Sequence, residues 1–405
     1  MTYGEVVELC LFSRRAPGGI AVNRLLCRCC LLVFLGLGAV KIAEARGSEY
    51  LEGPVGELVQ LNFSGRFTES LERVGNLLAA DAGDYRAYFV RAACYGWFIA
   101  ISPENRRYHN QFTESLRACI KHSSKIKSSD PEYSRALFFK ALAMITEARF
   151  KAIRGNYISS RWTTRGAKEA AEELVALVPQ DIDVWLPLAV FHYFWGGSSV
   201  WKRMAQFVAM VPRGKKELGL SLLEDCADKG EDSRLWASVA LLTIYLGEEN
   251  NTEKALKLAE RLHNSFPSNA VLHLVLGECQ RKLARWEQAE AVYRNITAKV
   301  LSRVPSYSEE VYEISRLRTV EAQVKLKKMD EAFAGVRSIL ISNPMHPEWI
   351  VPWAHLFTAC IYRYQGEWER AERACRYALD SHDHNGLHEQ ARQELKAIEK
   401  EEPFE

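Results

Sequence analysis

The sequence predicts an all-α protein, a right-handed solenoid of antiparallel helix pairs. A helical phrase with a small residue three positions after a tryptophan occurs twice. It reads "ARWEQAEAVYRNI" with Trp286 and Ala289, and "GEWERAERACRYAL" with Trp368 and Ala371. No run alternates apolar and polar residues as a strand would, and no glycine-rich loop marks a phosphate site. Units that repeat and are helical throughout must stack to bury their apolar faces.

The small residue of this phrase recurs through the C-terminal part of the chain. It stands in a phrase such as "EKA" or "DEA" at four positions: Ala255, Ala289, Ala332 and Ala371. The first two are 34 residues apart, and the later spacings of 43 and 39 indicate insertions at the repeat junctions. Twelve positions before each alanine is a mostly small residue: Thr243, Gly277, Val320 and Ala359. Two helices approach closely only where their contact residues are small, so each such pair predicts a helix crossing.

This pattern resembles the tetratricopeptide repeat (TPR), in which two helices cross at small residues, an aromatic residue follows, and a proline closes the unit. Tyr293 follows Ala289 by four positions, and Pro267 and Pro344 end units where a helix cannot continue. The resemblance is specific over residues 236–383. It implies a TPR-like solenoid that binds other proteins or peptides through its concave face.

Residues 46–235 read as degenerate helical repeats with long insertions inside the units. Ser70, Ala170 and Gly219 occupy the crossing position of three second-helix phrases. The whole array comprises about eight helix pairs. Residues 236–405 form the TPR array proper. It ends in a helix at 386–401 whose narrow apolar stripe suits a solvated cap.

Residues 1–45 read as a targeting segment. Arg24 and Arg28 precede the twelve-residue apolar run 29–40, and "AEA" at 43–45 follows as a cleavage site. This order is typical of a secretory signal peptide. The run is shorter than the ~20 residues of a transmembrane helix, although an uncleaved membrane anchor is the alternative. We therefore expect export, to the periplasm of a bacterium.

The charge and cysteine content exclude several classes of function. The leader accounts for the whole formal net charge of +2, so no basic field suggests nucleic acid as a partner. Six cysteines beyond the leader are scattered singly and form no zinc framework. His384 and His388 are four residues apart and could share one helix face as metal ligands, but Asn385-Gly386 predicts a turn between them. No local motif marks a nucleophile, so we expect neither an enzyme nor a cofactor.

Three basic and aromatic segments are the candidate binding site. They cover residues 100–112, 150–165 and 195–216, and each reads as an insertion between the first and second helix of its unit. Equivalent insertions project from one edge of a stacked array, so the three should be neighbours. We call the following residues the cationic edge: Arg106, Arg107, Tyr108, Tyr157, Arg161, Trp162, Arg165, Trp201, Lys202, Arg203 and Arg213. The alternative is that Trp195, Trp201 and Phe207 pack inside the solenoid and the charges are ordinary solvated ends.

These observations favour an exported scaffold that binds a protein or peptide and has no chemistry of its own. The second hypothesis is a membrane-associated factor in envelope assembly or lipid handling, which would dock through the cationic edge on an anionic membrane surface. The third is an enzyme built on helical repeats.

Overall fold

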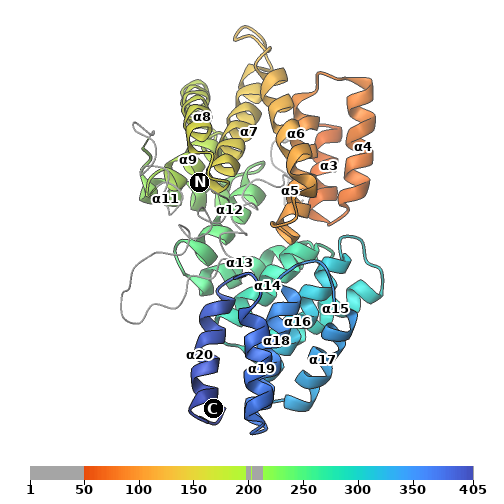
Figure 1. Ribbon diagram of the computed structural model, residues 1–405. Helices are drawn as coiled ribbons and strands as arrows, with labels where there is room; N and C mark the ends of the chain where they lie inside the picture. The colour runs from red at the N-terminus through yellow and green to blue at the C-terminus, as the bar shows by residue number, and fades with distance from the viewer. Residues whose placement is uncertain (1–49, 198–201, 203–212, 405) are drawn as a thin grey trace.

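The computed structural model describes residues 50–197, 202 and 213–404. These residues form 17 α-helices and no β-strand, which confirms the all-α prediction (Figure 1). None of the described helices is long and apolar enough to cross a membrane. The leader at 1–45 lies outside the described residues, so its cleavage or retention stays a prediction.

The helices pack as eight consecutive pairs followed by one last helix. The pairs are α3 (Pro54–Phe63) with α4 (Phe67–Ala80), α5 (Tyr85–Ile101) with α6 (His109–Ser123), α7 (Tyr133–Ile153) with α8 (Tyr157–Leu177), α9 (Trp185–Phe194) with α11 (Lys216–Lys229), α12 (Arg234–Gly247) with α13 (Thr252–Ser265), α14 (Ala270–Lys282) with α15 (Trp286–Leu301), α16 (Glu309–Lys325) with α17 (Met329–Ser342), and α18 (Ile350–Tyr364) with α19 (Trp368–Leu379). The cap helix is α20 (Leu387–Glu399), which packs on α18 and α19.

The fourth residue of nearly every second helix is small and buried against the first helix of its pair. These residues are Ser70, Ser160, Gly219, Ala255, Ala289, Ala332 and Ala371. The exception is Phe112 in α6, which is buried but large. A Cβ atom on Gly277 of α14 would lie 2.7 Å from the Tyr293 ring of α15, so this crossing requires a small residue. The crossing positions expected in the C-terminal array are therefore confirmed.

The crossing position of α8 is Ser160, and our assignment of Ala170 was wrong. The Ser160 hydroxyl donates to the carbonyl of Ala148, twelve positions earlier, at 2.7 Å. The Ser70 hydroxyl donates in the same way to Leu58, also twelve positions earlier, at 3.2 Å. Helix α8 is 21 residues long, so Ala170 lies farther along the same buried side.

The expected insertion at 150–165 is also wrong, because these residues are helical. Helices α7 and α8 are both 21 residues long and meet in the short turn 154–156. The expected insertion at 100–112 shrinks to residues 102–108, which include the 3₁₀ turn η2 (Arg106–Tyr108). Most of the third, at 195–216, lies outside the described residues.

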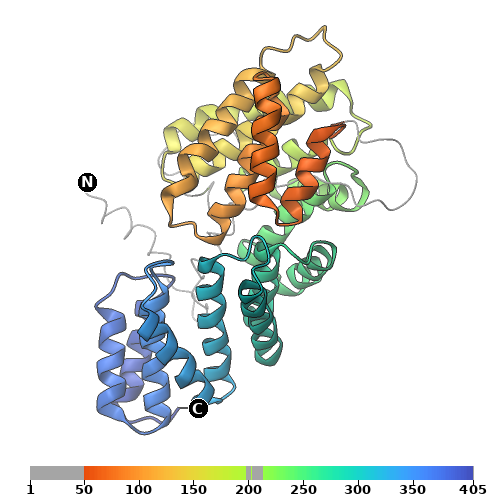
Figure 2. The same ribbon diagram turned by 90° about the vertical axis from the view of Figure 1, so that its right-hand side faces the viewer.

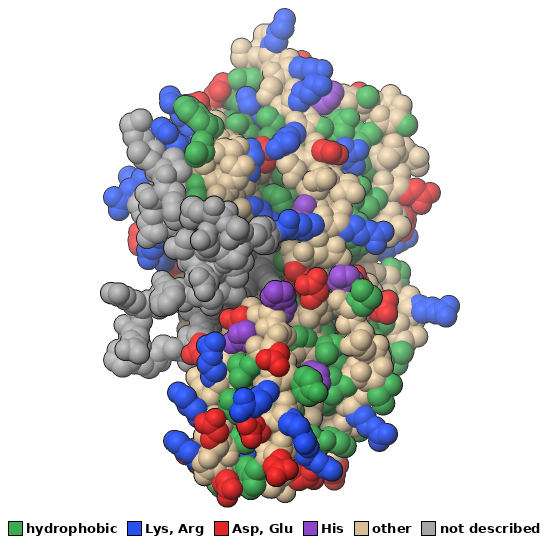
Figure 3. Space-filling view, in the orientation of Figure 1, with side chains coloured by type: hydrophobic (Ala, Val, Ile, Leu, Met, Phe, Trp, Pro, Cys, Tyr) green, Lys and Arg blue, Asp and Glu red, His purple; other side chains and the backbone are tan. Residues whose placement is uncertain are grey.

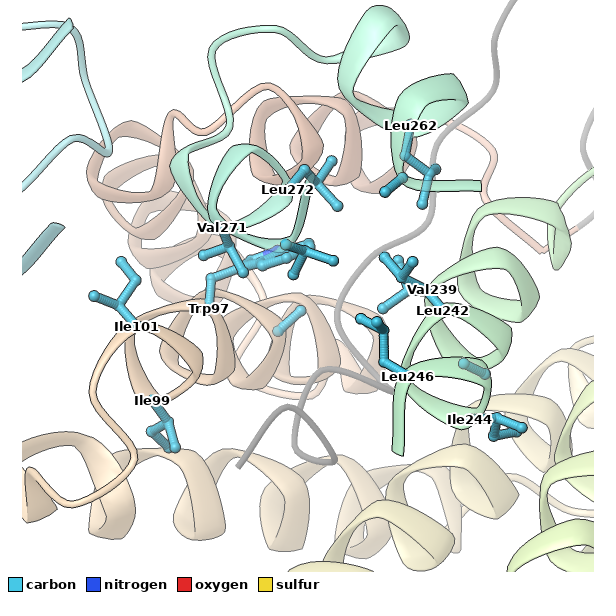
Figure 4. Packing of buried hydrophobic residues seen from close by; sticks show 14 of the residues in the cluster. Trp97, Ile99, Ile101, Val239, Leu242, Ile244, Leu246, Leu262, Val271 and Leu272 are labelled. Carbon is cyan, nitrogen blue, oxygen red and sulfur yellow. The ribbon is translucent and has the colours of Figure 1, made fainter. Parts of the chain in front are cut away.

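The inner faces of the first helices are packed rather than open. The Phe89 ring of α5 stacks on Trp236 of α12 with centroids 4.7 Å apart. Figure 4 shows Trp97 of α5 among apolar side chains of α12 and α14. Helices α5, α7 and α12 are consequently buried on most sides. The concave face is not the open partner surface that we expected in this half.

Contacts across the chain join the group α3–α12 to the group α13–α20, which Figures 1 and 2 show as an upper and a lower half. The rings of Phe63 and Phe266 are 5.1 Å apart, and the Asn269 amide donates to the carbonyl of Phe63 at 3.0 Å. The Trp349 indole donates to the Glu104 carboxylate at 3.1 Å. The loop before η2 is therefore held against the start of α18.

Candidate functional site

The first two segments of the cationic edge are neighbours in the structure. Arg154 at the end of α7 reaches the first turn of α6, where its Nη2 lies 2.6 Å from Nδ1 of His109. The same atom lies 3.4 Å from the carbonyl oxygen of Pro103. Gly155 adopts a left-handed φ of 78°, which allows the tight turn into α8. The structure thus brings the turn before α8 against the loop before η2 and the first turn of α6.

The contact between Arg154 and His109 requires a neutral imidazole. Burial lowers the pKa of His109 to about 4, and the positive charges of Arg154 and Arg106 add to the effect. Because a guanidinium only donates, the neutral ring accepts its hydrogen bond. At neutral pH the positive charge of this contact therefore belongs to Arg154 alone.

The start of α8 exposes two large apolar side chains. Ile158 is 69% exposed and Trp162 is 61% exposed. Four positions apart, they are neighbours on one side of the helix. The Arg161 guanidinium lies 5.1 Å from the centre of the Trp162 ring. We missed Ile158 in the sequence, although its spacing from Trp162 was the signal that could have found it.

Basic residues dominate this end of α8. Its first acidic residue is Glu169, and Arg161 and Arg165 precede it. Arg165 forms an exposed ion pair with Glu169 at 3.0 Å, and Lys151 of α7 pairs with the buried Glu147 at 3.0 Å. The local charge is therefore smaller than the sequence of 150–165 suggests. On the face shown in Figure 3, basic side chains outnumber acidic ones over the upper half, whereas both signs mix over the lower half.

The remaining residues of the cationic edge differ in their surroundings. Arg106 and Arg107 are exposed on η2, whereas the Tyr108 ring stacks on Phe98 with centroids 4.8 Å apart. Tyr108 therefore packs inward and holds η2 in place. Tyr157, at the start of α8, is half-buried.

In the third segment Lys202 and Arg213 are exposed, and Trp201, Arg203 and Phe207 lie outside the described residues. Trp195 is 1% exposed and stacks on Phe191, so it belongs to the core. Whether the third segment lies beside the other two stays a prediction.

A second surface, which the sequence did not suggest, lies on the outside of the C-terminal half. A groove of about 440 Å³ runs between α15 and α17 with α16 as its floor. Leu301 at its rim is 70% exposed. A shallower hollow over α17 itself adjoins it at Ser338.

The histidines near α20 do not form a shared pair. Asn385 and Gly386 both have left-handed φ values, of 61° and 78°, so His384 precedes the helix. A ring nitrogen of His388 lies 2.8 Å from the carbonyl oxygen of Ser381. Among the described residues, no three histidine, cysteine or acidic side chains gather as a metal site. The six cysteines in this part of the chain form no disulfide among the described residues.

Helix pairs that cross at small residues, stack in chain order and end in a cap helix define the architecture. The fold is TPR-like. Comparison with known proteins finds no matching family model and no matching curated protein.

Solved structures do match the TPR-like array, at low identity. The human IFIT1 dimer with m7Gppp-AAAA is 14% identical with a TM-score of 0.41, over 93% of this chain and 85% of that chain. The P58(IPK) TPR domain is 15% identical with a TM-score of 0.28, over 86% and 98%. NprR in complex with its cognate peptide NprX is 14% identical with a TM-score of 0.37, over 88% and 97%.

Proposed function

We propose that the chain is an exported scaffold that binds an acidic protein or peptide partner through its cationic edge and has no chemistry of its own. The observation that supports the proposal is the exposed Trp162 and Ile158 with Arg161 beside them, on a helix whose preceding turn contacts the first segment of the cationic edge through Arg154. Tryptophan and arginine are the residues that contribute most when they are desolvated at an interface.

The charges of the edge favour an acidic partner. Arg107 and Arg161 have no acidic ion-pair partner within the described part of the chain, and the pair of Arg165 with Glu169 is exposed. An exposed pair contributes little, so Arg165 can exchange its partner at small cost. Opposite charge on a partner would raise the rate of association and fix its orientation. Affinity itself would come mainly from covering the two apolar side chains.

Affinity purification from the native host, with mass spectrometry of the recovered proteins, tests this proposal. The variant Arg107→Ser, Arg161→Ser and Arg165→Ser should lose acidic partners that the parent chain recovers. The matched control replaces Lys257, Arg261 and Arg392, which are exposed elsewhere, with serine. Equal recovery by both variants would reject the cationic edge as the partner surface.

A membrane-associated role is the second candidate, and Ile158 is the observation that favours it. An exposed isoleucine beside a tryptophan and several arginines also suits an anionic bilayer surface. Each arginine near the surface would contribute about 1 kcal/mol, screened by salt. Co-sedimentation with anionic vesicles, using the same two variants and Ile158→Ser, distinguishes a lipid surface from an acidic protein.

Export is the remaining part of the proposal. The mature chain should begin near Arg46, which N-terminal sequencing of the exported form would establish. A product that retains residues 23–45 and stays in membranes would favour the anchor instead.

A further inference from the structure

The outer face of α17 carries an exposed stripe with an unusual composition. Its residues recur with helical spacing: Asp330, Phe333, Ala334, Arg337, Ser338 and Ile341. Ile341 is 73% exposed, and Phe333 is half-buried with its ring 5.9 Å from that of Tyr362. The stripe therefore has an acid at its start, Phe333 beside the small Ala334 at its centre, and a base, a serine and an apolar residue after them. Such a face admits close approach by another helix.

A shallow, open hollow lies over this stripe and is lined by residues of α17 alone. The hollow over α17 holds about 520 Å³, and Ser338 also lines the groove between α15 and α17. A Cβ atom on Gly335 would lie 2.6 Å from a methyl group of Val320, so α17 sits closely on α16.

The charged residues of the stripe form no ion pairs within the described part of the chain. Asp330 and Arg337 are both exposed, and neither joins an ion pair among the described residues. By contrast, Arg316 on the floor of the groove is already held by Glu313 at 2.9 Å. The stripe therefore presents one free acid and one free base, two helical turns apart.

We propose that a second copy of this chain docks here, with the two α17 helices antiparallel about a two-fold axis between Phe333 and Ala334. Asp330 and Arg337 lie equally far on either side of that point. Each Asp330 would therefore meet the partner's Arg337, and each Phe333 would cover the partner's Ala334. A two-fold interface must be complementary to itself, and an acid and a base placed symmetrically about the Phe333–Ala334 centre meet that requirement.

The proposed contact predicts a weak, reversible dimer. Stable interfaces bury roughly 800 Å² of surface on each partner. One helical face, together with Leu301 at the rim of the groove, buries less surface than a large obligate interface does. This inference goes beyond the proposed function and uses the opposite half of the chain from the cationic edge. Loss of one surface would therefore leave the other intact.

Sedimentation equilibrium of the full chain, from about 1 to 100 µM, tests the dimer by charge reversal. Asp330→Arg alone, or Arg337→Asp alone, would place like charges opposite one another in both symmetry-related pairs of the dimer. Either change should raise the dissociation constant of the dimer about tenfold or more. The double reversal restores both pairs and should return the dissociation constant to within a few-fold of the parent value. The matched control reverses Glu253 and Arg285, an exposed pair within one chain at 2.7 Å.

Two results of the sedimentation experiment would overturn the proposal. One is a parent chain that stays monomeric at the highest concentration. The other is a double reversal that remains as weak as either single change. Ser338→Trp gives an independent check, since a bulky side chain in the hollow should abolish the dimer while circular dichroism shows an intact helical fold. If Ser338→Trp instead spares dimerisation and removes a co-purifying protein, the hollow belongs to a different partner.

Discussion

Ala289 and Ala371 are fully buried at the helix crossings of their units, and Tyr293 packs against the same crossing from α15. The sequence could predict these positions because a crossing restricts side-chain size at a fixed spacing, and that restriction is local. Ser160 escaped detection for a physical reason. A buried serine is small enough for a helix crossing, and its hydroxyl is satisfied by donating to a carbonyl. Because serine is polar, a search for buried apolar residues passes over it.

Replacing either buried alanine with leucine should destabilise the fold. Ala289→Leu or Ala371→Leu adds volume where two helices already touch, and overpacking of this kind costs about 1–3 kcal/mol. Thermal and denaturant unfolding would measure the change. Ala176→Leu on the exposed side of α8 is the control and should be nearly neutral. Melting curves for both buried variants that match the parent would contradict the crossing assignment.

Buried histidines should make stability fall on acidification. Burial lowers the pKa of His273 to about 3 and that of His263 to about 4. Their rings stack 4.2 Å apart, and Nδ1 of His273 lies 2.9 Å from the Tyr307 hydroxyl. The unfolded chain therefore binds more protons than the folded chain between pH 6.5 and these lower values. Stability is full above pH 6.5 and is lost below it.

Replacement of one of these rings should reduce that pH dependence. His273→Gln removes one titrating group, so the slope of the unfolding free energy between about pH 6.5 and 4 should fall by up to ~1.4 kcal/mol per pH unit. Urea unfolding at a series of pH values would measure the slope. His346→Gln, in the exposed loop after α17, is the control. An unchanged slope in His273→Gln would show that folding does not lower the pKa of this ring.

Helices α7 and α8 show what the sequence concealed about the elements. Residues 157–165 lack acids and are rich in basic and hydroxyl residues, so they resembled a loop. In the structure the Asn156 side chain accepts from the Ser159 amide and starts α8 there. The buried side of these turns is made by Ser160 and Thr164, which a search for apolar periodicity does not register.

Replacing two glycines on second helices with alanine should change the stability of the fold in opposite directions. A Cβ atom on Gly219 of α11 would lie 2.2 Å from the backbone nitrogen of Tyr193 in α9. Gly219→Ala should therefore force the two helices apart and cost more than about 2 kcal/mol. Gly75 of α4 has open space at the same atom, so Gly75→Ala should stabilise by roughly 0.5–1 kcal/mol. Denaturant unfolding of the two variants would check the signs, and destabilisation of equal size would contradict the close approach of α9 and α11.

Contacts between distant parts of the chain were beyond prediction from the sequence. The periodic pattern specifies how each unit meets the next, but it carries no information about contacts 200 residues apart. Phe63 against Phe266, and Glu104 against Trp349, depend on the accumulated rotation of the whole array. For the same reason the sequence suggested an open concave face where α5 instead packs on α12 and α14.

The Trp349 bond should govern how firmly the loop at 102–108 is held. Trp349→Phe keeps a ring at the site but removes the indole donor, so these amides should exchange hydrogen faster, by about five- to tenfold for a bond worth ~1 kcal/mol. Hydrogen exchange with mass spectrometry would measure this. Trp368→Phe, at a half-exposed position on α19, is the control and should leave the loop unchanged. Equal exchange in both variants would mean that the bond does not hold the loop.

The contacts of α3 and α5 with α12–α14 also determine when the first units can finish packing during synthesis. During synthesis the first helices emerge without Trp236, Phe266 or Asn269. Phe89 therefore lacks its contact with Trp236 for about 150 more residues, and Phe63 lacks its contacts with Phe266 and Asn269 for about 200. Most helical arrays can complete each unit on its nearest neighbours as the chain grows. This chain completes its first units late, because contacts of high sequence separation must wait for the closing segment. A chain truncated before α12 lacks all three of these partners, so it should retain helices yet expose apolar surface and depend on chaperones.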